Sequence, residues 1–212
     1  TTSYPDYGES LWSRNMRAKT ELTPNDILDI NSYTKVRQER RAEILIKKKL
    51  RRVAVGPYAT FYFESYDTMW YQVQEMLRIE KGGKAQLMDE LCVYNPLIPK
   101  GEELVATVMF EIDNPGVRAA VLSSLGGVEE NITIQLDDEK ILAKPEQDID
   151  RTNSKGKASS VQFVHFGFTT PQIIKFKDAS TTVSVGINHP KYGHMAVLSR
   201  EARNELARDF IN

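Results

Sequence analysis

The sequence predicts an α+β fold in which a mixed, mainly antiparallel sheet is flanked by helices and preceded by an extended N-terminal arm. Segments with the strand period and the helix period alternate irregularly, so that strands are joined sometimes by helices and sometimes by short turns. A chain of 212 residues, 41% of them apolar, can carry its fold on one hydrophobic core. The first 20 residues follow neither period. We therefore expect an extended arm over residues 1–21 and a single α+β domain over residues 22–212.

Helical period and cap residues account for most of the first half of the chain. Thr23 and Pro24 have the signals of an N-cap and a first helical position. Longer helices are expected over residues 32–50, 67–81 and 84–94. A strand is expected over residues 58–64, after a turn at Gly56 and Pro57. Asp67 is the expected cap of the second helix. In the third helix we place Leu87, Met88, Leu91 and Cys92 on the inward face.

The second half alternates strands with short helices. Strands are expected over residues 104–112, 128–136, 141–143, 160–168, 181–187 and 195–198. Helices are expected over residues 113–126, 170–177 and 199–210, the last two started by caps at Thr170 and Ser199. Residues 144–159 have no apolar period, and loops of that length commonly serve a function.

Composition and missing motifs exclude several classes of protein. Cys92 is the only cysteine, which excludes intrachain disulfides, CxxC motifs, thiolate zinc sites and an iron–sulfur cluster held by this chain alone. No apolar run approaches the roughly 18 residues of a membrane helix, and no signal-like segment opens the chain. GxSxG, Walker A and Glu-x-x-His motifs are absent from the sequence. We expect a cytoplasmic protein with no membrane span and no cofactor of its own.

The net charge of −1 hides a basic window over residues 35–52, which contains nine Lys or Arg and two Glu. This window carries +7 and the remainder −8. A pI near 6.3 and the lack of any nucleic-acid-binding motif argue against nucleic acid. Docking to an acidic protein partner fits better, and an aromatic side chain in the N-terminal arm gains by packing on a partner. The candidate partner-binding residues are Lys47, Lys48, Lys49, Arg51, Arg52 and Trp12.

Two further candidate sites lie in the C-terminal third. His189 and His194 flank a turn with Pro and Gly, and His165 lies in a predicted strand. If the three imidazoles converge, they could hold one divalent metal ion; core histidines with one hydrogen bond each are the alternative. The loop at residues 150–160 contains Arg151, Lys155 and Lys157, the residues of an anion-binding site, with a polar surface loop as the alternative.

Six separated strings of the sequence resemble one bacterial domain family of unknown function, from about Leu22 to the C-terminus. They are residues 51–57 with 59–64, 74–80, 94–99, 150–153 with 156–161, 189–190 and 192–197. The resemblance implies no activity. Because members tend to be encoded beside rubrerythrin-like di-iron proteins and cysteine-rich iron–sulfur oxidoreductases, it implies an accessory role in peroxide or oxidative-stress chemistry.

We therefore expect an accessory, partner-binding subunit of a redox or oxidative-stress complex. The expected assembly is a homo-oligomer or a hetero-complex with a rubrerythrin-like or iron–sulfur oxidoreductase partner. The alternative is a metal-dependent enzyme that uses His165, His189 and His194 together with the anion-binding loop. Whether the chain is an enzyme stays open.

Overall fold

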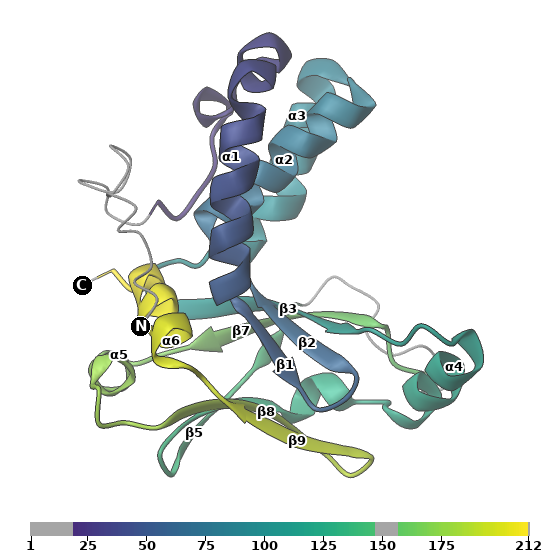
Figure 1. Ribbon diagram of the computed structural model, residues 1–212, viewed down its shortest axis with the longest axis vertical. Helices are drawn as coiled ribbons and strands as arrows, with labels where there is room; N and C mark the ends of the chain where they lie inside the picture. The colour runs from purple at the N-terminus through teal and green to yellow at the C-terminus, as the bar shows by residue number, and fades with distance from the viewer. Residues whose placement is uncertain (1–18, 147–156, 212) are drawn as a thin grey trace, which may run out of the picture.

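The computed structural model describes residues 19–146 and 157–211, and combines two antiparallel sheets with a group of projecting helices (Figure 1). The first sheet, in spatial order, contains β1 (Arg52–Val55), β2 (Ala59–Phe63), β3 (Glu103–Phe110), β7 (Val161–Gly167) and β6 (Lys144–Pro145). The second sheet contains β5 (Glu139–Leu142), β4 (Ile132–Leu136), β8 (Val183–His189) and β9 (Tyr192–Val197). The expected α+β class is confirmed, but the strands form two sheets instead of one.

The two sheets bury their apolar faces against each other. Along β4, Ile132, Ile134 and Leu136 are buried while the residues between them are half-buried, and β7 shows the same alternation. A sheet with one apolar face must cover it, and a second sheet of the same kind does so. The inner faces of both sheets supply one continuous core, which includes Phe61, Phe63, Val108, Phe166, Val183 and Val185.

Short helices close the ends of this two-sheet body. They are α4 (Pro115–Ser124), α5 (Thr170–Lys177) and α6 (Arg200–Leu206), with 3-10 turns at Val128–Asn131 and Ala207–Asp209. Two more 3-10 turns, Pro24–Asp26 and Asn95–Leu97, lie before α1 and after α3. Phe168, Phe176 and Phe210 pack edge to face where α5 and α6 meet the body. Thr169 caps α5, one residue before the expected cap. The expected strand over residues 128–136 starts only at Ile132, because a 3-10 turn precedes it.

Three helices project from the outer face of the first sheet, and we call them the helical projection (Figure 1). They are α1 (Ile30–Leu50), α2 (Tyr66–Glu80) and α3 (Gly83–Tyr94). A second, smaller core joins them to that face through Val105 on β3 and includes Leu22, Met69, Val73, Leu91, Leu97 and Ile98. The projection therefore has its own apolar cluster, separate from the core between the sheets.

Two sequence expectations for the projection were wrong in detail. Ser65 caps α2 in a reciprocal box with Thr68, so the helix starts one residue before Asp67. Met88 and Cys92 are exposed on α3, whereas Leu91 is buried. The cause is that α3 packs on α2 along one side only, so its opposite face meets solvent.

Ion pairs and hydrogen bonds fasten α1 to α2. The Tyr33 hydroxyl donates to Glu75 at 2.6 Å, and Arg37 donates two hydrogen bonds to the same carboxylate at 2.7 and 2.8 Å. The hydrogen bond from Arg37 outweighs burial, and the pKa of Glu75 falls to about 2. Glu75 is therefore ionised at neutral pH and accepts hydrogen bonds from both the Tyr33 hydroxyl and the Arg37 guanidinium of α1.

The hydroxyl group of one tyrosine forms hydrogen bonds between the two sheets. Tyr192 on β9 accepts hydrogen bonds from the backbone N–H groups of Tyr58 and Ala59, at 2.9 and 2.8 Å, and donates to the Val55 carbonyl at 2.7 Å. Gly56 in the same turn has φ +71, and a Cβ there would lie 2.5 Å from the His194 ring. The turn between β1 and β2 thus needs glycine at this position.

In the part of the chain that the structure describes, none of the helices combines the length and the apolar character needed to cross a membrane.

Candidate functional site

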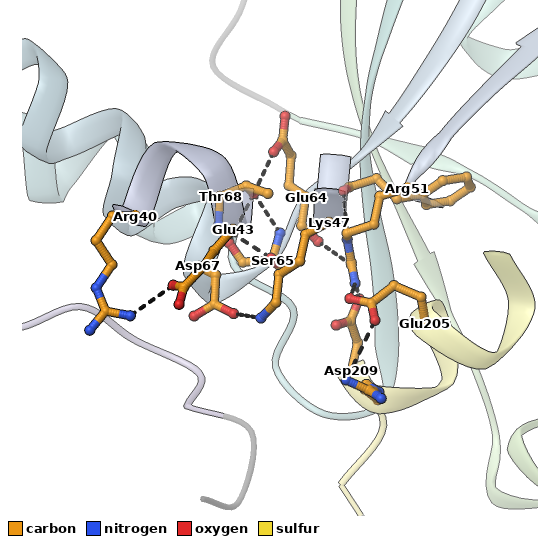
Figure 2. Close-up of polar contacts among 12 residues, drawn as sticks. Arg40, Glu43, Lys47, Arg51, Glu64, Ser65, Asp67, Thr68, Glu205 and Asp209 are labelled. Carbon is orange, nitrogen blue, oxygen red and sulfur yellow. Dashed lines mark hydrogen bonds and ion pairs between the residues drawn. The ribbon is translucent and has the colours of Figure 1, made fainter. Parts of the chain in front are cut away.

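The base of the helical projection is organised around Arg51, which directly follows α1. Its guanidinium donates to the carbonyls of Phe63 and Glu64 at 2.9 and 2.8 Å, to Glu205 at 3.4 Å and to Asp209 (Figure 2). Only 2% of Arg51 is exposed. Arg51, one of the expected partner-binding residues, is thus buried in the fold, and each of its three guanidinium nitrogens already joins α1 to the end of β2 or to the C-terminal helix.

The Arg51 cluster, which we define as Arg51, Glu205 and Asp209, contains one cation and two carboxylates in a buried setting. Burial raises the pKa of Asp209 to about 6, with a smaller contribution from Glu205, although Arg51 opposes the shift. Glu205 also lies 3.7 Å from Arg208, whereas Asp209 pairs with Arg51, and burial disfavours the charged form of Asp209. The cluster therefore takes up a proton on Asp209 in mildly acidic solution.

Beside this cluster, a cleft of about 340 Å³ separates the helical projection from the outer face of the first sheet. Lys48 of α1 and Met69 and Gln72 of α2 line one side, and Tyr62 of β2 and Met109 of β3 line the other. Arg51, Phe63, Glu64 and Thr68 complete the lining. The cleft was not foreseen from the sequence, because its two sides come from segments that are far apart along the chain.

The polar groups of the cleft differ in whether they have partners. The Glu64 carboxylate accepts hydrogen bonds from Thr68 and Thr107 at 2.7 and 2.9 Å, and the Tyr62 hydroxyl donates to Glu111 at 2.7 Å. The Lys48 ammonium lies 5.7 Å from the centroid of the Tyr71 ring and forms no ion pair with any residue that the structure describes. Lys48 is therefore the cation of the cleft that can pair with a ligand.

The basic window divides into cations that hold the fold and cations that face outward. Arg37 pairs with Glu75. Figure 2 shows two further pairs, Arg40 with Glu43 and Lys47 with Asp67. Arg52 lies 3.6 Å from Glu111 and its guanidinium lies 5.3 Å from the Tyr62 ring. Lys35, Arg41, Lys48 and Lys49 have no ion pair within residues 19–146 and 157–211. Of the predicted partner-binding lysines, Lys47 thus has a structural role, and Lys48 and Lys49 are available.

Arg41, Leu45 and Lys48 form a stripe on α1, since their spacing of four and three residues places them on one side of a helix. We call this the α1 stripe. Leu45 is 57% exposed, and the neighbouring Ile46 is 60% exposed. A partner that offers carboxylates beside an apolar side chain could pair with the two cations and cover Leu45 at the same time. Because Lys48 also lines the cleft, the α1 stripe leads into it.

The three histidines of the predicted metal site do not form one site. On β7, the two ring nitrogens of His165 lie 3.1 Å from Glu103 and 2.8 Å from Glu146. His189 belongs to the second sheet and lies 3.3 Å from the Gly126 carbonyl. No group of three or more potential metal ligands occurs among the described residues.

Both nitrogens of His165 are occupied by carboxylates. Burial opposes the charged ring, but the hydrogen bonds that the ring donates to Glu103 and Glu146 outweigh it and raise the pKa of His165 above its usual value. His194 instead packs on Tyr192 with 4.6 Å between the ring centroids. These imidazoles therefore fill structural positions in two different sheets.

Part of the predicted anion-binding and partner-binding sets lies outside the described residues. This applies to Arg151 and Lys155 of the loop and to Trp12 of the N-terminal arm. Lys157 is described and exposed.

Comparison with known proteins places the chain among relatives of unassigned function. Residues 21–210 match a family described as protein of unknown function (DUF3501). A crystal structure of a novel protein of unknown function from Burkholderia pseudomallei K96243 is similar, with 34% sequence identity and a TM-score of 0.81. The match covers 89% of this chain and 98% of that chain. No curated protein matches the sequence.

Proposed function

Because the chain belongs to the DUF3501 family, whose description assigns no function, we propose one from the geometry: a partner-binding accessory protein whose helical projection docks an acidic segment of another protein. The α1 stripe carries this proposal. In it, Arg41 and Lys48 have no ion pair among the described residues, and Leu45 between them is exposed. A partner surface that offers carboxylates around an apolar residue would satisfy all three.

The mixture of charge and apolar surface favours a protein over a nucleic acid. A phosphate backbone binds clustered cations and polar hydrogen-bond donors, and it makes few favourable contacts with exposed aliphatic side chains. Leu45 and Ile46 lie among the free cations of α1 and would remain exposed on a phosphate surface. An amphipathic acidic segment covers both kinds of group at once.

The partner class implied by the family resemblance remains the one that we propose. It comprises rubrerythrin-like di-iron proteins and cysteine-rich iron–sulfur oxidoreductases. With one cysteine, this chain cannot ligate an iron–sulfur cluster alone, so in such a complex it would bind and orient a partner that holds the cofactor. The role would be an accessory one in peroxide or oxidative-stress chemistry.

Affinity measurements on a charge-reversed projection test this function. The Arg41→Glu/Lys48→Glu variant is compared with Lys140→Glu/Lys191→Glu, which makes the same charge change on exposed residues of the second sheet. Biolayer interferometry against a purified rubrerythrin-like or iron–sulfur partner should show a Kd at least about tenfold weaker for the first variant. The control should bind as the wild type does.

Two results would contradict the proposal at different levels. Equal weakening by both double variants would show that general charge, and not the α1 stripe, attracts the partner. No complex between the wild-type chain and either class of redox protein would show that the proposed partner class is wrong.

A further inference from the structure

The size of the cleft is suited to one large side chain. Its volume of about 340 Å³ lies at the lower end of the range of roughly 300–1,000 Å³ that is typical of small-molecule sites. A dinucleotide or a haem would not be covered by so small a space. The anchor residues of protein interfaces, by contrast, are single aromatic or long aliphatic side chains that enter pockets of this kind.

The lining favours an apolar occupant. The Met69 and Met109 thioethers and the Tyr62 ring supply adaptable, polarisable surface on both sides of the cleft. At the end of the cleft that lies by Arg51, the polar groups are already satisfied: Glu64 by two hydroxyl groups, and Arg51 by carbonyls and carboxylates. A charged group placed there would gain no new partner and would lose its water.

Charge is nevertheless available on the α1 side of the cleft. The Lys48 ammonium lies over the Tyr71 ring and has no ion pair in the part of the chain that the structure describes. Arg41 lies seven residues earlier on the same face of α1, roughly 10 Å away at 1.5 Å per residue. Two carboxylates about 10 Å apart match two turns of a helix, or three residues of an extended strand. The apolar side chain must lie next to the carboxylate that pairs with Lys48.

We propose that the cleft is the anchor pocket of the docking surface: it receives one large apolar side chain of the acidic segment, while the flanking carboxylates pair with Lys48 and Arg41. This inference rests on the proposed function and specifies the partner's recognition element. That element is a pair of acidic residues with an aromatic or long aliphatic residue beside one of them.

Fluorescence polarisation with two labelled acidic peptides tests the anchor pocket. Both peptides contain Glu residues at the required spacing, and they differ only in a Phe or an Ala beside one Glu. The wild-type chain should bind the Phe peptide about tenfold more tightly, because the ring is transferred from water into the cleft. Gln72→Trp, which fills the cleft, should abolish this preference without changing the affinity for the Ala peptide.

A second variant protects the test against misfolding. Met109→Ala removes one wall of the cleft and should reduce the preference for the Phe peptide. Met195→Ala, at an exposed methionine on β9 of the second sheet, should leave the preference unchanged. Arg41→Glu should weaken the binding of both peptides by the same factor.

The failures are distinguishable. Equal affinity of the wild type for the Phe and Ala peptides overturns the anchor pocket and leaves acidic docking intact. No binding of either peptide overturns acidic docking and the anchor pocket with it. Self-association of the chain that Gln72→Trp removes, measured by sedimentation velocity, would assign the cleft to a second copy of this chain and overturn the proposal.

Discussion

The two-sheet body and the helical projection are stabilised by different kinds of contact. The body buries the inner faces of both sheets, and five of the seven residues of β8 are buried. In the 21 residues of α1, only Tyr33 and Ile44 are buried. A helix of that length draws most of its stability from tertiary contacts, so α1 depends on ion pairs and hydrogen bonds to α2 and at its base. The body is thus held mainly by apolar burial between its sheets, whereas most of the α1 surface is held by polar contacts or meets solvent.

The largest expected effect is a loss of stability from a substitution in the core of the two-sheet body. Phe166 is fully buried, and its ring centroid lies 6.3 Å from that of Phe63. Phe166→Ala should lower the free energy of unfolding by about 3–5 kcal/mol, because the cavity cannot collapse between two sheets. Leu45→Ala on the projection should change it by no more than about 0.5 kcal/mol. Urea denaturation followed by circular dichroism measures both, and similar losses would contradict the contrast between the regions.

An intermediate effect concerns the joint between the regions, where Asp209 meets Arg51. The pKa of Asp209 is raised to about 6 in the folded chain, from a reference value of 3.8. A carboxyl group with a raised pKa binds its proton more tightly in the folded state, so its contribution to stability grows as the pH falls through 6. Between about pH 7.5 and pH 5 the gain is about 1.4 kcal/mol.

Denaturant titrations of the wild type and Asp209→Asn at several pH values test this joint. Subtracting the two curves removes groups that titrate in both proteins. His165 is one such group. Because its pKa is raised in the folded chain, it contributes stability at pH values below its usual pKa, and this contribution is lost as the pH rises. Glu75 has a lowered pKa and would lose its contribution only in more acidic solution. A flat difference curve would show that Asp209 stays ionised beside Arg51.

The smallest expected effect concerns one hydrogen bond between α1 and α2 in the helical projection. Tyr33→Phe removes one hydrogen bond to Glu75 and keeps the two from Arg37. We expect a loss of about 1 kcal/mol in the free energy of unfolding. Lys35→Gln is the control, because Lys35 is exposed and lies two residues after Tyr33, roughly 200° around α1. If hydrogen exchange shows no faster opening of α1 in Tyr33→Phe than in the control, the bond to Glu75 does not fasten the helix.

Local patterns in the sequence predicted the elements well, because caps and periods act over a few residues. The helices and strands lie within a few residues of their expected bounds, and the α+β class is confirmed. Ser199 caps α6 as expected. The shifts at Ser65 and Thr169 arise because a neighbouring hydroxyl residue offered an equally good cap.

Long-range pairing decided what the sequence could not show. The division into two sheets separates β7, with His165, from the turn with His189 and His194. Arg51 looked like its neighbours in a run of cations, yet its partners Glu205 and Asp209 lie more than 150 residues away. The cleft likewise needs α1, α2, β2 and β3 together. A single sequence contains no local signal for any of these arrangements.

The Tyr192 hydroxyl also has a consequence for how the body opens. Its three hydrogen bonds tie the turn between β1 and β2 to β9, more than 130 residues along the chain. The Tyr58 and Ala59 amides cannot exchange with solvent by fraying of a local hairpin, since their acceptor belongs to the other sheet. We therefore expect the two sheets to open together at this corner, and the end of this hairpin to resist the local unfolding that hairpin ends commonly show.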